Sequence, residues 1–479
     1  MPQYVVVLIA LNLVAGLFLS LAQIIIALLP NSQPRRHDAK NKSFVSILVP
    51  AYNEPPAILM QTLEALSHLK YADFEVLVID NNTKDQAIWK PVETFSKTLG
   101  ERVHFFHVEN LSGFKAGALN YLLPHINTKA EFVAVVDADY FMNQDFLSIA
   151  VPYFSEEKIA LIQFPQQYRN CTEENQPIAD EYRHFFEIYM NMANRLDCVP
   201  STGTVSLYRL DVLRQIGGFR GEALTEDADV GLRIYGAGYR GIYIDRPIGF
   251  GLMPYDLESY RKQKWRWAFG NAQSLKTLFL LWGKIPFYSW LGFLSHLTAW
   301  HHFHFLPFAV LAAFPVILHP AIPITYCHKQ ILVIASLSIF ITLASKWLLF
   351  WVTLRKKENS VIRSVKAFFV HMGMTLVYSE AWIAFLFQKK FIFERTNKFL
   401  LEKMPSLVKN SCWELLLGFW YLLGAGVAVF FGKPIIVLAF LVATMVLFSV
   451  YYLHWKILPT KAHSKKILDG LEKRYQKYL

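Results

Sequence analysis

The sequence predicts a Rossmann-like α/β domain inserted between membrane-spanning helices, in a chain of 479 residues. Three observations predict this architecture. Hydrophobic residues make up 54% of the chain and charged residues 18%, against about 45–50% and about 25% in a typical soluble domain. Long apolar runs gather at the two ends of the chain. The segment 43–275 instead alternates short β-branched runs with helical patterns.

The first element is an apolar run from residue 4 to 29, long enough to cross a bilayer of roughly 30 Å as a helix. It lacks the basic start and small-residue cleavage site of a signal peptide, so residues 1–30 are predicted to be a retained transmembrane helix. Arg35 and Arg36 follow it. Because basic residues favour the cytoplasmic side, we expect the α/β domain in the cytoplasm.

Four short apolar runs in this domain are rich in β-branched residues and predict strands. They lie at residues 44–49, 74–79, 103–108 and 132–136. Helical patterns at 57–69 and 115–123 lie between them. This alternation favours parallel strands with crossover helices, whose ligands gather at the carboxyl ends of the strands.

Further apolar runs fill residues 276–455. Four of them are predicted to cross the membrane, near residues 296–318, 331–354, 412–431 and 434–453. A fifth run, 361–387, has basic residues at both ends, and a single crossing there would leave one basic cluster outside. It is therefore predicted to be an interfacial helix on the cytoplasmic surface. The total is about five transmembrane helices, with six as the alternative, and a basic cytoplasmic tail at 456–479.

The charge balance is basic, with 48 Lys and Arg against 37 Asp and Glu, which gives +11. Much of the excess flanks apolar runs, where it sets topology or contacts membrane lipid, so no nucleic-acid partner is predicted. The four cysteines show no paired spacing, which indicates neither a zinc site nor a disulfide framework.

Asp137 and Asp139 directly follow the predicted strand 132–136. Carboxylates two residues apart point the same way in an extended chain. Hard oxygen ligands at the carboxyl end of a strand suit Mg²⁺ or Mn²⁺ bound together with phosphate. The alternative is that both residues only shape a turn.

Asp80 closes the second predicted strand and is followed by Asn81 and Asn82. These residue types also form turns and helix caps. The functional alternative is that Asp80 recognises the base or ribose of a nucleotide. The segment 50–54, which contains Ala51 and Glu54, ends the first strand and could line the same pocket.

Residues 225–229 begin a predicted helix that runs to about Gly236. One interpretation is a Thr225 cap with acidic residues placed favourably near the helix N-terminus. The other makes Asp227 a general base that takes a proton from an acceptor hydroxyl.

The run 263–267 precedes the membrane region and has the composition of an aromatic and basic membrane-interface belt. Its functional interpretation has Arg266 neutralising a diphosphate, with Gln263 and Trp267 holding a sugar.

Taken in order, these segments resemble the processive, membrane-integrated family 2 glycosyltransferases, such as the bacterial cellulose synthases. The matching segments occupy about residues 43 to 275. They are 50–54, Asp80, 115–120, 137–139, 163–166, Gly203-Thr204, 225–227 and Gln263-x-x-Arg266-Trp267.

The resemblance implies a GT-A catalytic fold and inversion at the anomeric carbon. It makes Asp227 the catalytic base and assigns Asp137 and Asp139 to the nucleotide diphosphate and a Mg²⁺ or Mn²⁺ ion. The other residues that it implies bind nucleotide or sugar are Ala51, Glu54, Asp80, Lys115, Gln263, Arg266 and Trp267.

The expected reaction is transfer from a nucleotide-sugar, with a UDP-linked donor favoured, to a growing polysaccharide that the spans export. One alternative is a single-sugar transferase acting on a lipid or glycolipid. A transporter with a degenerate nucleotide-binding domain is the other, and the intact carboxylates argue against it. The expected location is a bacterial inner membrane.

Residues 393–398, within 389–408, look like the Phe-x-Val-Thr-x-Lys gating loop of cellulose synthases. Arg395 departs from that pattern, because the family has Val there. The alternative is an ordinary basic cytosolic loop.

Overall fold

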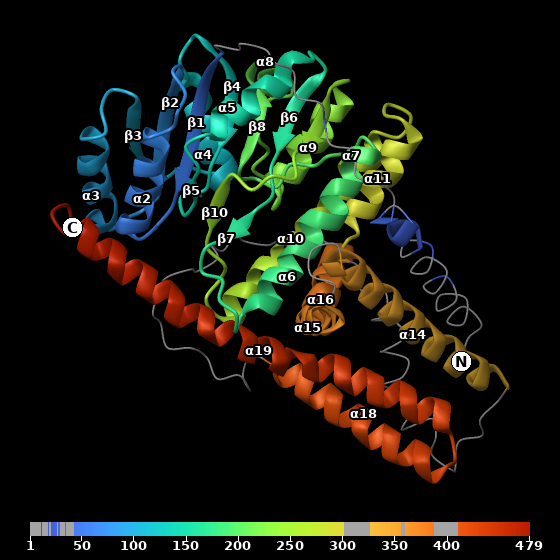
Figure 1. Cartoon of the computed structure of the whole chain (residues 1–479). Helices are drawn as coiled ribbons and strands as arrows, with labels where there is room; N and C mark the ends of the chain where they lie inside the picture. The colour runs from blue at the N-terminus through green and yellow to red at the C-terminus, as the bar shows by residue number, and fades with distance from the viewer. Residues whose placement is uncertain are drawn as a thin grey trace.

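The computed structural model describes residues 43–300, 326–355, 360–387 and 411–479, with a few positions between 11 and 34. Most of the predicted N-terminal helix, the stretch 301–325 and the whole predicted gating loop, 389–408, lie outside the described residues. An α/β domain forms one side of the molecule, and the C-terminal helices extend away from it (Figure 1).

The α/β domain is built on a seven-stranded sheet of order β3-β2-β1-β4-β8-β6-β9. Its strands are β1 Phe44–Ala51, β2 Phe74–Asn81, β3 Val103–Val108, β4 Ala130–Val135, β6 Ile159–Gln163, β8 Ser206–Arg209 and β9 Arg240–Tyr243. The first four coincide with the predicted strands to within two residues at each end.

The sheet is mixed rather than wholly parallel, because β8 runs antiparallel to both β4 and β6. The chain leaves β6 at the carboxyl edge, makes a long helical excursion and returns to the same edge, so β8 must run backwards. The sequence did not reveal this strand. The four residues of β8 show no alternation of apolar and polar side chains, and nothing in them indicates in which direction a strand would run.

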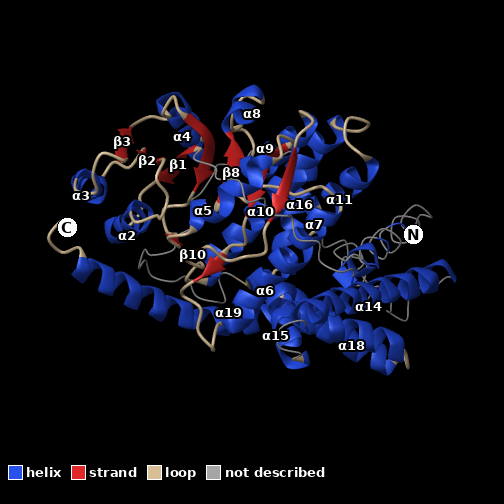
Figure 2. Cartoon of the chain, turned by 45° about the horizontal axis from the view of Figure 1, so that its top comes forward, coloured by secondary structure: helices blue, strands red, loops and turns tan. Residues whose placement is uncertain are grey.

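Helices cover both faces of the sheet, so β2 is buried throughout and β1 is buried except at Phe44 (Figure 2). Ile47 and Val49 of β1 pack into one core with α2 and α3, whereas Leu48 packs into the opposite core with α4, α8 and α9. Burial on both faces explains the continuous apolar runs that predicted these strands. The helices are α2 Pro56–Ser67, α3 Gln86–Lys97, α4 Phe114–Leu122, α8 Leu210–Gln215 and α9 Glu226–Gly236.

A smaller sheet of order β5-β10-β7 extends the domain. Its strands are β5 Phe141–Met142, β10 Gly249–Gly251 and β7 Gln167–Tyr168. Short helical segments accompany the two sheets: η1 Leu123–His125, α5 Phe146–Ala150 and η2 Val151–Ser155. The helices that lead toward the C-terminal region are α6 Gln176–His184, the π-helical η3 Phe185–Met190, α7 Asn191–Arg195, α10 Leu257–Leu280 and α11 Phe287–Leu297.

The C-terminal part of the chain is helical wherever it is described. It contains α14 Tyr326–Arg355, α15 Val361–Met372, α16 Thr375–Leu386, α18 Cys412–Phe430 and α19 Pro434–Arg474. Among the described residues, α18 and α19 are long and apolar enough to cross a membrane. The region predicted to be one interfacial helix is a pair, α15 and α16, bent by 41°, which could also form one broken span. The total of five crossings therefore stays a prediction.

The predicted basic tail is not a separate element, because α19 continues through it and lies along the α/β domain (Figure 1). Tyr475 is buried, and its hydroxyl donates to Glu64 Oε2 of α2 at 2.5 Å. Its ring packs edge-on against Phe95 of α3 at 5.3 Å. Arg474 forms a second contact with Glu64 at 2.6 Å. The helix α19 thus extends from a candidate membrane span to α2 and α3, which pack against the first half of the sheet.

Tyr475→Ala is expected to destabilise the protein by about 3 kcal/mol, because it removes a buried aromatic ring and leaves a void. Thermal unfolding in detergent micelles measures the effect, with Gln476→Ala at the exposed neighbouring position as the control. An unchanged melting temperature for Tyr475→Ala would show that the end of α19 does not stabilise the domain.

Candidate active site

The predicted site residues meet at the carboxyl edge of the main sheet. Strand register places Ala51 beside Asp80, and β4 ends directly before the Asp137 loop. A cavity of about 310 Å³ lies at this edge. Of the predicted site residues, those that line it are Ala51, Glu54, Lys115, Asp137, Asp139, Asp227, Gln263, Arg266 and Trp267. Asp80 does not line it.

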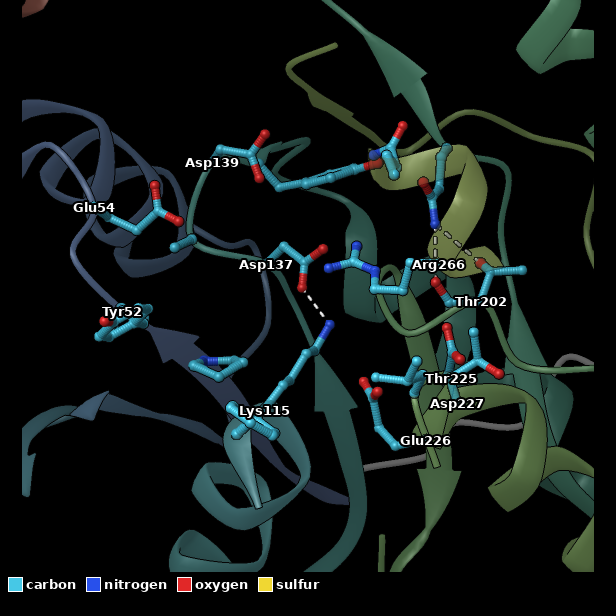
Figure 3. A pocket seen from close by; sticks show the side chains of 18 of the residues that line it. Tyr52, Glu54, Lys115, Asp137, Asp139, Thr202, Thr225, Glu226, Asp227 and Arg266 are labelled. Carbon is cyan, nitrogen blue, oxygen red and sulfur yellow. Dashed lines mark hydrogen bonds and ion pairs between the residues drawn. The ribbon is translucent and has the colours of Figure 1, made fainter. Parts of the chain in front are cut away.

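Lys115 and Asp137 form an ion pair in the centre of this cavity (Figure 3). The Lys115 Nζ atom lies 2.5 Å from Asp137 Oδ1 and donates to the Gly203 carbonyl at 2.7 Å. Burial acts to lower the pKa of Lys115, but Asp137 and Glu226 raise it above its usual value. Lys115 is therefore a fixed positive charge. The Arg266 guanidinium points toward Asp137 from the other side (Figure 3).

Asp139 is buried beside Asp137, and its Oδ2 atom accepts a hydrogen bond from the Leu252 amide at 2.8 Å. Arg169 donates to the Asp139 carbonyl oxygen at 3.1 Å. These contacts fix the loop that carries both carboxylates.

The donor chemistry of Asp137 and Asp139 fits Mg²⁺ or Mn²⁺. Within the parts of the chain that the structure describes, no group of three or more His, Cys, Asp or Glu side chains is placed around one point. Mg²⁺ is commonly held by one or two carboxylates together with substrate phosphates and water. Two carboxylates on one rigid loop supply the protein's share of such a site.

Asp227 lies in the first turn of α9, and its side chain lines the cavity. Burial and the neighbouring Glu226 carboxylate raise the pKa of Asp227 to about 7, against the opposing effects of Lys115 and Arg266. A carboxylate with this pKa is suited to general-base catalysis near neutral pH. The predicted helix is confirmed, but Thr225 makes no side-chain cap hydrogen bond.

The backbone at Gly203 approaches Asp227 so closely that only glycine fits. A Cβ atom there would lie 2.6 Å from Asp227 Oδ2, and the φ angle of +78° is also unfavourable for other residues. Because the same residue accepts a hydrogen bond from Lys115, Gly203 brings the candidate base and the Lys115–Asp137 pair together.

Gln263, Arg266 and Trp267 lie on one face of α10, as their spacing predicts. The Gln263 Oε1 atom accepts a hydrogen bond from the Tyr182 hydroxyl. Trp267 packs edge-on against Tyr182 at 5.8 Å and lies 5.5 Å from the Trp300 ring. Burial lowers the pKa of Arg266, and nearby carboxylates oppose this shift. Trp267 therefore forms an aromatic wall of the cavity, with Tyr182 packed behind it, next to a buried guanidinium.

Asp80 is held outside the cavity by two contacts. Thr83 donates to its Oδ2 atom at 2.9 Å, and His107 Nδ1 lies 3.1 Å from its Oδ1 atom. Burial raises its pKa, although both contacts act to lower it. Asn81 and Asn82, which follow it, line the cavity instead. A direct contact between Asp80 and a nucleotide stays a prediction.

Several lining residues were not assigned a role from the sequence. Glu226 stands inside a motif that was recognised, so its proximity to Asp227 could have been read from the sequence. Tyr168 and Thr202 come from a short strand and a loop, and they reach the cavity only through tertiary structure. No local pattern marks them.

Comparisons with known proteins identify relatives by sequence and one solved structure with a similar fold. A family model described as "Glycosyltransferase like family 2" matches residues 42–270. The chain is 26% identical over 239 residues to the cellulose synthase catalytic subunit [UDP-forming] of Xanthomonas axonopodis pv. citri, covering 48% of this chain and 31% of that protein. It is 26% identical over 245 residues to glucomannan 4-beta-mannosyltransferase 7 of Arabidopsis thaliana, covering 49% and 44%. The match spans less than half the length of either relative.

A solved mannosyltransferase from Pyrobaculum calidifontis, in complex with GDP-Man and Mn²⁺, shares the fold with a TM-score of 0.57. The two are 18% identical, and the alignment covers 81% of this chain and all of that one. The described α/β domain therefore has the GT-A-like architecture that the sequence predicts.

Proposed function

We propose that this chain, whose residues 42–270 match a family 2-like glycosyltransferase model, transfers a sugar from a nucleotide-sugar to a growing polysaccharide with inversion at the anomeric carbon. The observation that carries this proposal is the cavity at the sheet edge. It combines fixed positive charges, Lys115 and Arg266, with a carboxylate, Asp227, whose pKa is about 7.

Each group then has a defined task. Asp227 takes the proton from the acceptor hydroxyl as that oxygen attacks the anomeric carbon. Lys115 and Arg266 neutralise the charge that develops on the departing diphosphate. Asp137 and Asp139 would hold Mg²⁺ or Mn²⁺, which supplies further electrostatic stabilisation to the diphosphate when bound. A base and positive charges for the leaving group within one cavity suit a single displacement with inversion.

A second, smaller cavity of about 40 Å³ adjoins the candidate base. It shares Asp227 and Trp267 with the main cavity and extends to Phe185 and Trp300, near the C-terminal helices. Flat aromatic faces are good partners for the apolar faces of sugar rings, so we propose that the acceptor approaches Asp227 from the side of Trp267. We propose that the catalytic domain is cytoplasmic and that the helices embed the protein in an inner membrane.

Purified protein in micelles, incubated with radiolabelled UDP-glucose, UDP-N-acetylglucosamine or GDP-mannose, tests the proposal. We expect one donor to give a labelled polymer together with nucleotide release. One relative is a UDP-forming synthase and the solved mannosyltransferase binds GDP-Man, so donors of both nucleotides belong in the panel. A one-sugar lipid product would replace the polymer proposal with a glycolipid transferase. Absence of any labelled product would overturn both.

A further inference from the structure

A buried ion pair lies directly behind the aromatic wall of the cavity. Lys264 of α10 and Glu181 of α6 approach to 2.5 Å between Nζ and Oε2. Their side chains are only 1% and 3% exposed. Removing two charges from water is costly, and a buried pair often stabilises a fold no better than apolar residues of the same size. Its geometry is therefore more informative than its contribution to stability.

The Glu181 carboxylate joins three helices. Its Oε2 atom also accepts a hydrogen bond from the Tyr260 hydroxyl at 2.8 Å. Its Oε1 atom lies 3.1 Å from Nδ1 of His371, which belongs to α15. Burial acts to raise the pKa of Glu181, but Lys264 and His371 lower it to about 2. The carboxylate is therefore ionised, and both of its oxygens are engaged.

The Lys264 ammonium group lies against Trp267, which lines the cavity, and against Tyr182, which is packed behind it. It is 4.1 Å from the ring centre of Tyr182 and 4.9 Å from that of Trp267, within the range of cation–π attraction. Tyr182 in turn donates its hydroxyl to Gln263 Oε1. Because that oxygen is engaged, the Gln263 amide would meet an acceptor hydroxyl as a donor.

We propose that Glu181 and Lys264 are positioning residues that set the orientation of Gln263 and Trp267 toward the acceptor. This proposal rests on the proposed transfer reaction. Glu181 fixes the ammonium group, the ammonium group fixes the Tyr182 and Trp267 rings, and Tyr182 fixes the Gln263 amide. Neither charged residue touches the substrate. Their effect is to keep the acceptor hydroxyl aligned with the donor, so that the sugar reaches the acceptor rather than water.

The test uses the double variant Glu181→Gln/Lys264→Met, which removes both charges while keeping similar volumes. The full-length variant is compared with wild type in micelles, using whichever of UDP-glucose and GDP-mannose the wild type accepts. The ratio of sugar incorporated to nucleotide released is expected to fall at least about 10-fold, since small misplacements can cost about 100-fold. The KM for the donor and the melting temperature should stay close to wild type.

Glu258→Gln/Lys262→Met is the matched control. These two residues form an exposed ion pair on the same helix, at 3.1 Å, so the control loses one charge of each sign, as the test variant does. Its incorporation ratio should equal that of wild type. A stable double variant with a wild-type ratio would overturn the positioning role. If the double variant does not fold, Glu181→Asp, which keeps both charges but shortens the reach of the carboxylate, is measured by the same ratio, with the same two outcomes. If wild type transfers no sugar, the proposed function fails rather than this inference.

Discussion

Asp227→Asn is expected to reduce sugar transfer by about 10²–10⁴-fold, the usual effect of removing a positioned general base. Asparagine has nearly the same size, so the contact with Gly203 is retained, but its amide cannot accept the proton. Nucleotide binding should change little, because Lys115, Asp137 and Arg266 remain in place. Initial rates of sugar incorporation and titration with the nucleotide diphosphate measure the two effects separately. Turnover like that of wild type would remove Asp227 from the mechanism.

The pH profile gives an independent check on the same residue. Burial first, and the Glu226 carboxylate second, raise the pKa of Asp227 to about 7. A base must be deprotonated to act, so kcat/KM should fall about tenfold per pH unit below that value. Glu226→Gln removes a like charge, which should lower the Asp227 pKa and move the acid limb to lower pH. A limb that stays in place would show that another group controls it.

The sequence predicts where a site residue lies when the pattern that places it is contained in one short segment. Asp137 and Asp139 follow an apolar strand, so their place at the carboxyl edge of the sheet could be predicted without knowledge of their neighbours. Gln263, Arg266 and Trp267 share a helix face because their spacing follows the helical period. The central strands were predictable for the same reason, since burial on both faces leaves a continuous apolar run.

The remainder depends on pairs of residues that are distant in the chain. Asp80 is held by His107, which lies on the neighbouring strand 27 residues later. Glu181 and Lys264 are separated by 83 residues and meet only when α6 packs against α10. Lys264 was therefore interpreted as part of a basic membrane-interface belt, although it is buried. No local period can indicate which lysine will meet a buried carboxylate.

Removal of divalent metal should abolish transfer, and Mn²⁺ or Mg²⁺ should restore it. In the proposed mechanism Lys115 and Arg266 neutralise only part of the charge on the departing diphosphate, and a hard cation held by Asp137 and Asp139 would supply the rest. Transfer and nucleotide binding are measured in excess EDTA and again after each ion is added back. Full activity in EDTA would rule out a metal role for both carboxylates.

Two substitutions of Asp139 separate metal binding from loop structure. In the native protein Asp139 Oδ2 accepts a hydrogen bond from the Leu252 amide at 2.8 Å. Asp139→Asn removes the charge but can keep an oxygen that accepts this hydrogen bond. Asp139→Ala removes both the charge and the acceptor, and a buried amide left without a partner costs about 1–3 kcal/mol. Both variants should therefore lose metal-dependent nucleotide binding, whereas only the alanine variant should also melt at a lower temperature. If Asp139→Asn binds nucleotide in a normal metal-dependent manner, the Asp139 carboxylate serves the loop rather than the ion.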